Sequence, residues 1–237
     1  MSNLLLISNS TMPGTAFFTW PKPYVKDFLP PGIKEILFIP FAAVTLSLDE
    51  YEEKVKAAFE ALGFQAQSLH QVKDKKVAVE KAEAIVVGGG NTFVLLSRLY
   101  AHGLVDLIRN RVTSGIPYIG WSAGANLAGP TIMTTNDMPV VQPPSFEALN
   151  LVPFQLNPHY HELKFETQGG ETRRERLEEF MVMNPHRKVI GLPEGMLLQR
   201  NGQKLVLLGD RDRVAKLYQP GMEIENLYSG QDLSNIM

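Results

Sequence analysis

The nine residues IPYIGWSAG at positions 116–124 decide the fold class, because an apolar run passes directly into a glycine-bounded serine. A short apolar run of this kind is typical of a buried strand, and Gly120-Trp121-Ser122-Ala123-Gly124 is the G-x-S-x-G pattern of a strand-to-helix turn. The small flanking residues permit a tight turn that exposes the hydroxyl, and the following helix N-terminus stabilises negative charge. The pattern predicts that Ser122 is a nucleophile. The alternative is a serine that only caps a helix.

On either side of this stretch, short apolar runs alternate with longer segments of helical period, which predicts parallel strands joined by crossover helices. We expect strands at Leu4–Ser8, Ile36–Pro40, Phe64–Leu69, Ala84–Val87, Tyr118–Trp121 and Val189–Leu192. We expect helices at Leu48–Leu62, Asn91–Val112, Ala123–Ala128 and Arg173–Met183.

The C-terminal part changes character. Met196–Arg200 and Lys204–Leu208 flank Asn201-Gly202, which is a two-residue hairpin signal. The predicted fold is therefore α/β, a mostly parallel sheet with helices on both faces and an antiparallel C-terminal hairpin at its edge. A chain of 237 residues suits one domain over residues 1–237.

The composition excludes several function classes. Hydrophobic residues make up 44% and charged residues 20%, with a net charge of -2, and the basic residues are scattered, so we expect no nucleic-acid partner. There is no cysteine, and the five histidines lack metal-ligand spacing, so we expect no metal and no organic cofactor. The N-terminus predicts a first strand, and no stretch reaches the roughly 20 apolar residues of a membrane span, which favours a cytoplasmic protein without a membrane partner.

A second glycine-rich segment, Gly88-Gly89-Gly90-Asn91-Thr92, follows the predicted strand Ala84–Val87. Consecutive glycines let backbone N–H groups approach a ligand closely, so this loop is a candidate oxyanion site near Ser122. A phosphate cradle is the alternative, although the Gly-Lys-Ser/Thr ending of such loops is missing. A plain strand-to-helix turn is the third interpretation.

A serine nucleophile needs a general base and a group that orients the base. His159 is the best candidate base because it follows Thr134–Pro158, a proline-rich segment predicted to be a long functional loop, and His161 is the second choice. Asp137 within that loop and Glu194 after the strand Val189–Leu192 are the candidate orienting carboxylates, and we expect Asp137 more than Glu194.

A capping box of Thr172 and Glu175 predicts a helix that starts at Arg173. The helical period places Arg173 on the face of Leu177, toward the protein. A cation in the first turn opposes the helix dipole, which indicates either a bound carboxylate or a structural salt bridge.

Taken together, these motifs resemble the peptidase E family of α-aspartyl dipeptidases, whose relatives include cyanophycinase within the class I glutamine amidotransferase-like fold. The matching segments cover almost the whole chain; they are residues 86–92, 120–126, 157–159, 170–173 and 191–195. The resemblance implies serine-dependent hydrolysis of dipeptides with an N-terminal aspartate, with Ser122 as nucleophile and His159 as base. It implies Asp137 or Glu194 as the third member, and the loop Gly88, Gly89, Gly90 and Asn91, with Ala123 and Arg173, around the substrate.

Two alternatives to this activity are a cyanophycinase-like hydrolase of β-aspartyl linkages and a non-catalytic binding or chaperone-like member of the same fold. Retention of both Ser122 and His159 argues against the second alternative. The expected partner is a small Asp-X peptide, and the expected assembly is a monomer or a small homo-oligomer.

Overall fold

The computed structural model describes residues 2–163 and 169–237. Its strands are β1 (Asn3–Ile7), β2 (Glu35–Ile39), β3 (Gln65–Ser68), β4 (Ile85–Val87), β5 (Tyr118–Trp121), β6 (Gln155–Pro158), β7 (Val189–Leu192), β8 (Met196–Asn201), β9 (Lys204–Gly209), β10 (Ala215–Tyr218) and β11 (Glu225–Leu227). Its helices are α1 (Lys22–Phe28), α2 (Leu48–Glu60), α3 (Lys75–Lys81), α4 (Thr92–Ala101), α5 (Val105–Thr113), α6 (Ala123–Asn126), α7 (Arg173–Met183) and the 3-10 helix η1 (Ser234–Ile236).

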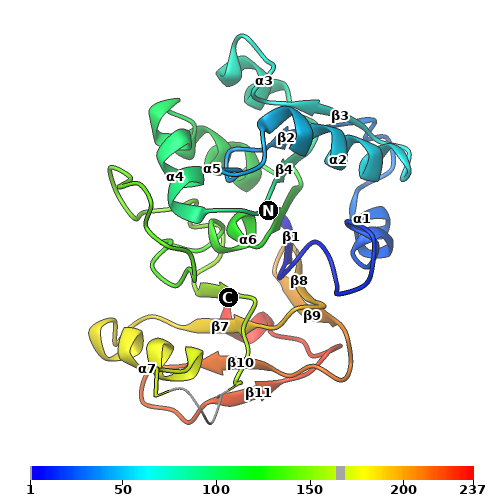
Figure 1. Cartoon of the computed structure of the whole chain (residues 1–237). Coiled ribbons are helices and arrows are strands. Elements are labelled where there is room, and N and C mark those ends of the chain that lie inside the picture. The colour runs from blue at the N-terminus through cyan, green and yellow to red at the C-terminus, as the bar shows by residue number, and fades with distance from the viewer. Residues whose placement is uncertain (1, 164–168) are drawn as a thin grey trace.

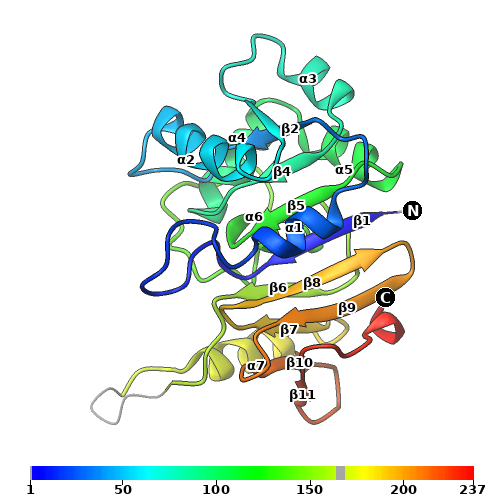
Figure 2. The same cartoon turned by 90° about the vertical axis from the view of Figure 1, so that its right-hand side faces the viewer.

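The main sheet has seven strands in the order β3-β2-β4-β5-β1-β8-β9. The first five strands are parallel, and the predicted β8–β9 hairpin joins β1 in antiparallel register. Its turn is Gly202-Gln203 and not the expected Asn201-Gly202, because Asn201 still pairs with Lys204. Helices α1 and α2 cover one face, while α3, α4 and α5 cover the other (Figures 1 and 2). Alternate side chains of a strand point to opposite faces of the sheet, so each face has its own apolar core. Leu5 and Ile7 of β1 pack in the core on one face, and Leu4 and Leu6 pack in the core on the other. The predicted α/β class is confirmed.

A second sheet of four strands, β11-β10-β7-β6, lies beside the main sheet (Figure 2). The segment Val189–Leu192 therefore does not belong to the main sheet, which corrects our expectation of a single sheet. The loop predicted over residues 134–158 is also corrected, because its last four residues form β6. Strand β6 is hard to predict from sequence, since buried Gln155 and Asn157 interrupt its apolar pattern.

The helix predicted over Asn91–Val112 is two helices. Helix α4 ends at Ala101, and Gly103, with a φ of 62°, turns the chain into α5. The apolar period continues through this break, because both helices pack on the same core. Helices α1 and α3, with seven residues each, were not predicted, since they are too short for a clear period.

The two sheets are arranged so that several strand ends converge. Strands β4, β5 and β1 are neighbours in the main sheet, and β6 and β7 run parallel with Pro158 opposite Leu192. One apolar core includes Leu4 and Leu198 of the main sheet and Leu156, Ile190 and Leu217 of the second sheet. The carboxyl ends of strands from both sheets therefore border one region, which is where ligands bind in α/β folds.

Within residues 2–163 and 169–237, no helix combines the length and the apolar character needed to cross a membrane.

Candidate active site

Ser122 occupies the turn between β5 and α6 in a strained conformation, with φ of 53° and ψ of -113°. The neighbouring glycines make this turn possible: a Cβ on Gly120 would lie 2.3 Å from the Gly124 carbonyl oxygen, and one on Gly124 would lie 2.3 Å from that of Val87. The side chain of Ser122 makes no helix-capping hydrogen bond. The interpretation of Ser122 as only a capping residue is therefore wrong, because its hydroxyl is directed elsewhere.

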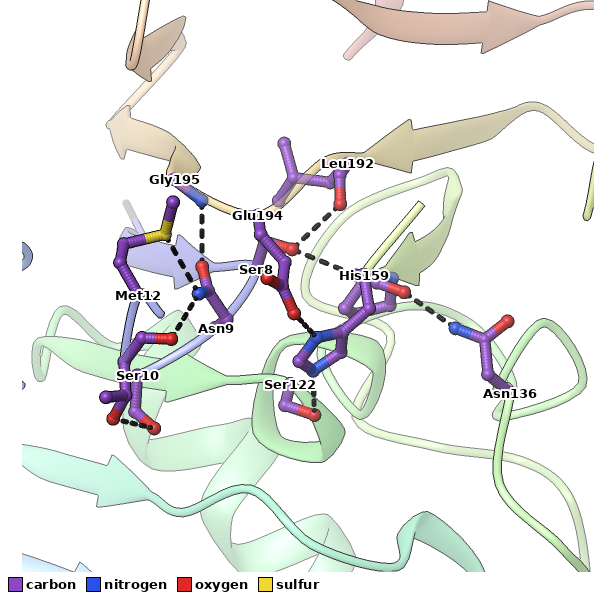
Figure 3. A network of polar contacts seen from close by, with 12 residues as sticks. Ser8, Asn9, Ser10, Met12, Ser122, Asn136, His159, Leu192, Glu194 and Gly195 are labelled. Atoms are coloured by element: carbon purple, nitrogen blue, oxygen red, sulfur yellow. Dashed lines mark hydrogen bonds and ion pairs between the residues drawn. The ribbon is translucent and has the colours of Figure 1, made fainter. Parts of the chain in front are cut away.

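His159 connects Ser122 to Glu194 (Figure 3). Its Nε2 lies 2.9 Å from the Ser122 Oγ, and its Nδ1 lies 2.7 Å from the Glu194 Oε1. A carboxylate only accepts hydrogen bonds, so Nδ1–H donates to Glu194, and the Nε2 lone pair accepts from the Ser122 hydroxyl. Ser122 follows β5 of the main sheet, whereas His159 and Glu194 follow β6 and β7 of the second sheet. The two sheets thus bring together the three polar side chains of a catalytic-triad arrangement.

Asp137, which we expected beside His159, bonds to other residues. Its Oδ2 accepts hydrogen bonds from the Thr92 N–H at 2.7 Å, the Thr92 hydroxyl at 2.5 Å and the Thr135 hydroxyl at 3.0 Å. Asp137 therefore holds the N-terminus of α4, where a carboxylate is favourable. The expected preference for Asp137 over Glu194 is corrected by these contacts. His161, the second choice of base, is exposed and makes no hydrogen bond to Ser122.

Ser8 is a buried site residue that sequence reasoning missed. Its hydroxyl accepts a hydrogen bond from the His159 N–H at 2.9 Å and donates one to the Leu192 carbonyl at 2.8 Å. It thereby holds His159 in a backbone conformation with a φ of 55°. Next to it, the Asn9 Oδ1 accepts from the Gly195 N–H at 2.8 Å. The only sequence signal was the position of both residues directly after β1.

The glycine loop contributes unequally to the site. The Gly88 N–H donates to the Ile39 carbonyl, and the Asn91 side chain caps α4 and donates to the Met138 carbonyl. Both residues thus have structural contacts, and their expected contacts with the substrate stay a prediction. A Cβ on Gly89 would lie 2.9 Å from the Ser122 Cβ, which places the Gly89 backbone directly against Ser122. Among the described residues, the N–H groups of Gly89, Gly90 and Ala123 have no acceptor. These three N–H groups are the candidate oxyanion donors.

Arg173 lines a polar cavity of about 250 Å³ together with Ser122, His159 and Asp137. Its Nε is buried without a hydrogen-bond partner, and in the described part of the chain Arg173 forms no ion pair. Burial lowers the pKa of Arg173, and the nearby Arg176 lowers it further, while Asp137 opposes the shift. A half-buried guanidinium without an ion-pair partner among the described residues favours the bound-carboxylate interpretation over a structural salt bridge.

Comparison with known proteins agrees with this geometry. Residues 4–208 match the model of Peptidase family S51. The chain belongs to peptidase family S51. Two relatives in the family are named Peptidase E: a Nostoc protein is 45% identical over 99% of this chain and 96% of its own, and an Actinobacillus pleuropneumoniae protein is 47% identical over 90% and 91%.

Solved structures share the fold of this chain. The crystal structure of a peptidase from an acI-B1 Actinobacterium covers 98% of this chain with a TM-score of 0.70 and 19% identity, a likeness that concerns the fold alone. A solved structure from Listeria monocytogenes EGD-e covers 89% of this chain with a TM-score of 0.67 and 25% identity. The resemblance inferred from the motifs is thus confirmed at the level of the family: this S51 member is a peptidase, a hydrolase whose substrate is a peptide.

Proposed function

We propose that this protein is a serine-type dipeptidase that hydrolyses peptides with an N-terminal L-aspartate through an acyl-enzyme. The observation that carries the proposal is the unbroken contact chain from Glu194 through His159 to Ser122, beside a cavity that holds an unpaired Arg173. The charged residues of that cavity support the proposed substrate class. The contacts between Glu194, His159 and Ser122 support the proposed type of reaction.

In the proposed reaction, the Ser122 Oγ attacks the scissile carbonyl carbon and gives its proton to the His159 Nε2. Glu194 stabilises the imidazolium that forms, and the N–H groups of Gly89, Gly90 and Ala123 donate to the oxyanion. His159 then protonates the leaving nitrogen as the C–N bond breaks. Water attacks the resulting ester, its proton passes through His159 to Ser122, and aspartate is released.

The cavity supports an N-terminal aspartyl group in particular. Arg173 supplies one cation, and Asp137, which lines the same cavity, supplies one anion. An N-terminal aspartyl residue carries the opposite pair, a side-chain carboxylate and an α-ammonium. A guanidinium binds a carboxylate through two parallel hydrogen bonds, which the neutral side chain of Asn cannot reproduce, so Asp is preferred over Asn.

The test compares kcat/KM for Asp-Leu, Asn-Leu, Glu-Leu and a β-aspartyl dipeptide in the wild type and in Arg173→Met. We expect Asp-Leu to be the best substrate of the wild type, and the loss of the buried charge partner to cost about 2 to 5 kcal/mol for Asp-Leu alone. Ser122→Ala is the blank for contaminating peptidase. An unchanged Asp-to-Asn ratio in Arg173→Met would make Arg173 structural, and better cleavage of the β-aspartyl peptide would favour the cyanophycinase-like alternative.

Three further features stay predictions: a single domain over residues 1–237, a cytoplasmic location, and a monomeric or small homo-oligomeric state.

A further inference from the structure

A second cavity borders the same catalytic group. It has a volume of about 300 Å³, is lined by Ser122, His159 and Glu194, and lies beside apolar side chains that include Phe17 and Trp121. Ser122 and His159 thus stand between two cavities, and the polar one holds the aspartyl group under the proposed function, on which this inference rests. Because the scissile carbonyl must lie at Ser122, the leaving amino acid extends into the second cavity.

An apolar pocket of about 310 Å³ lies beside this second cavity. The two share four lining residues, Leu46, Tyr51, Gly89 and Gly90, and the apolar pocket adds residues 42–45, Asn91 and Val140. Tyr51 is fixed between them, since its hydroxyl accepts from the Trp121 Nε1 at 3.0 Å and donates to the Gly89 carbonyl at 3.1 Å. The combined space accommodates an apolar side chain on the leaving amino acid.

Lys54 is the single cationic side chain that lines the second cavity within the described residues. It lies on α2 one turn after Tyr51, is exposed, and makes no ion pair within 4.0 Å in that part of the chain. The nearby Glu50 accepts hydrogen bonds from Ser47, at 3.0 Å from its N–H and 2.7 Å from its hydroxyl. The other charged residue of the cavity, Glu194, already binds His159. Glu50 attracts Lys54 electrostatically but forms no close ion pair with it, so the Lys54 ammonium can pair with an anionic ligand.

We propose that the second cavity is the leaving-group subsite and that Lys54 pairs with the free α-carboxylate of the substrate's second residue. A dipeptide presents that carboxylate one residue after the scissile bond, whereas a longer peptide presents a neutral amide there. Lys54 thereby favours dipeptides over longer peptides. The contact is charge-assisted but partly exposed, so its effect on the rate is moderate and falls as salt is added.

The experiment measures kcat/KM for Asp-Leu and for Asp-Leu amide in wild type, Lys54→Met and Lys56→Met. Lys56 is an exposed lysine of the same helix that does not line the cavity, so it provides a matched control. We expect the wild type and Lys56→Met to prefer Asp-Leu about tenfold over the amide, and Lys54→Met to lose this preference through slower cleavage of Asp-Leu alone. The wild-type preference should shrink as KCl is raised.

The role of Lys54 would be overturned if the wild type had nearly equal kcat/KM for Asp-Leu and its amide, or if Lys54→Met kept the wild-type ratio of these two values. Either result would leave the proposed dipeptidase activity in place. Wild-type kcat/KM for Asp-Gly equal to that for Asp-Leu would overturn the apolar part of the subsite. If the wild type cleaves neither Asp-Leu nor its amide, the proposed function fails, and the subsite assignment fails with it. Thermal unfolding of each variant verifies that the exposed substitutions leave the fold intact.

Discussion

At the scale of single residues, the proposed function requires that His159 be oriented to take the proton of Ser122. The carboxylate at Nδ1 fixes the tautomer, and the 2.7 Å contact assigns this position to Glu194. Asp137 contacts Thr92 and Thr135 instead. The two carboxylates therefore have separable effects on catalysis and on stability.

We predict that Glu194→Gln lowers kcat for Asp-Leu by up to about 10⁴-fold, because an amide that donates to Nδ1 imposes the wrong tautomer. Asp137→Asn should lower kcat far less, while raising KM and lowering the thermal midpoint, because it weakens the contacts at the start of α4 and the anion of the substrate cavity. Steady-state kinetics and thermal unfolding of both variants check this. A larger loss of kcat in Asp137→Asn would return the orienting role to Asp137.

At the scale of secondary-structure elements, the site depends on how the ends of β1, β6 and β7 are joined. The fully buried Ser8 hydroxyl connects the His159 N–H after β6 to the Leu192 carbonyl of β7. Removing the hydroxyl leaves the buried His159 N–H without an acceptor, whereas the Leu192 carbonyl still accepts a hydrogen bond from the Tyr160 N–H at 3.1 Å. An unpaired buried donor costs more than a simple loss of contact.

We predict that Ser8→Ala lowers the free energy of unfolding by about 1 to 3 kcal/mol. It should also lower kcat by about ten- to a hundredfold, because His159 loses the contact that positions its backbone. Denaturant unfolding and kinetics on Asp-Leu measure both effects. Ser114→Ala, which removes an exposed hydroxyl at the end of α5, is the control and should change stability by less than about 0.5 kcal/mol. If Ser8→Ala had the same kcat as the wild type, Ser8 would only stabilise the fold.

At the scale of the whole molecule, Ser122 and His159 follow strands of different sheets, so their contact exists only while both sheets are folded together. Their side chains share one apolar core, in which Leu217 of β10 is 2% exposed. The two tryptophans, Trp20 and Trp121, both pack on the opposite face of the main sheet. Tryptophan fluorescence therefore reports chiefly on the packing of the main sheet.

We predict that Leu217→Ala lowers stability by about 2 to 5 kcal/mol and shifts the fluorescence midpoint and the far-UV circular dichroism midpoint by the same amount. The reason is that a cavity in the second sheet weakens the core on which the main sheet also depends. Val182→Ala, at a residue 77% exposed, should shift neither midpoint. A fluorescence midpoint that stays at the wild-type value would mean that the two sheets unfold independently.

The sequence by itself determined the features that depend on neighbouring residues. The G-x-S-x-G turn, the β8–β9 hairpin and the capping box before α7 involve residues a few positions apart, so their chemistry is visible in the printed order. The parallel strands of the main sheet were predicted in the same way, from short apolar runs that alternate with segments of helical period. The contact between His159 and Ser122 was expected from the sequence because a serine nucleophile would require a base.

Only the tertiary structure decided the choice between Glu194 and Asp137, the role of Ser8, and the second sheet. Ser8 and His159 are 151 positions apart, and His159 and Glu194 are 35 apart, so their contacts depend on which strands become neighbours. Asp137 is nearer to His159 in sequence than Glu194 is, but its loop leads it to the start of α4. Contact between distant residues is set by strand register and by the packing of a shared core, which local patterns do not contain.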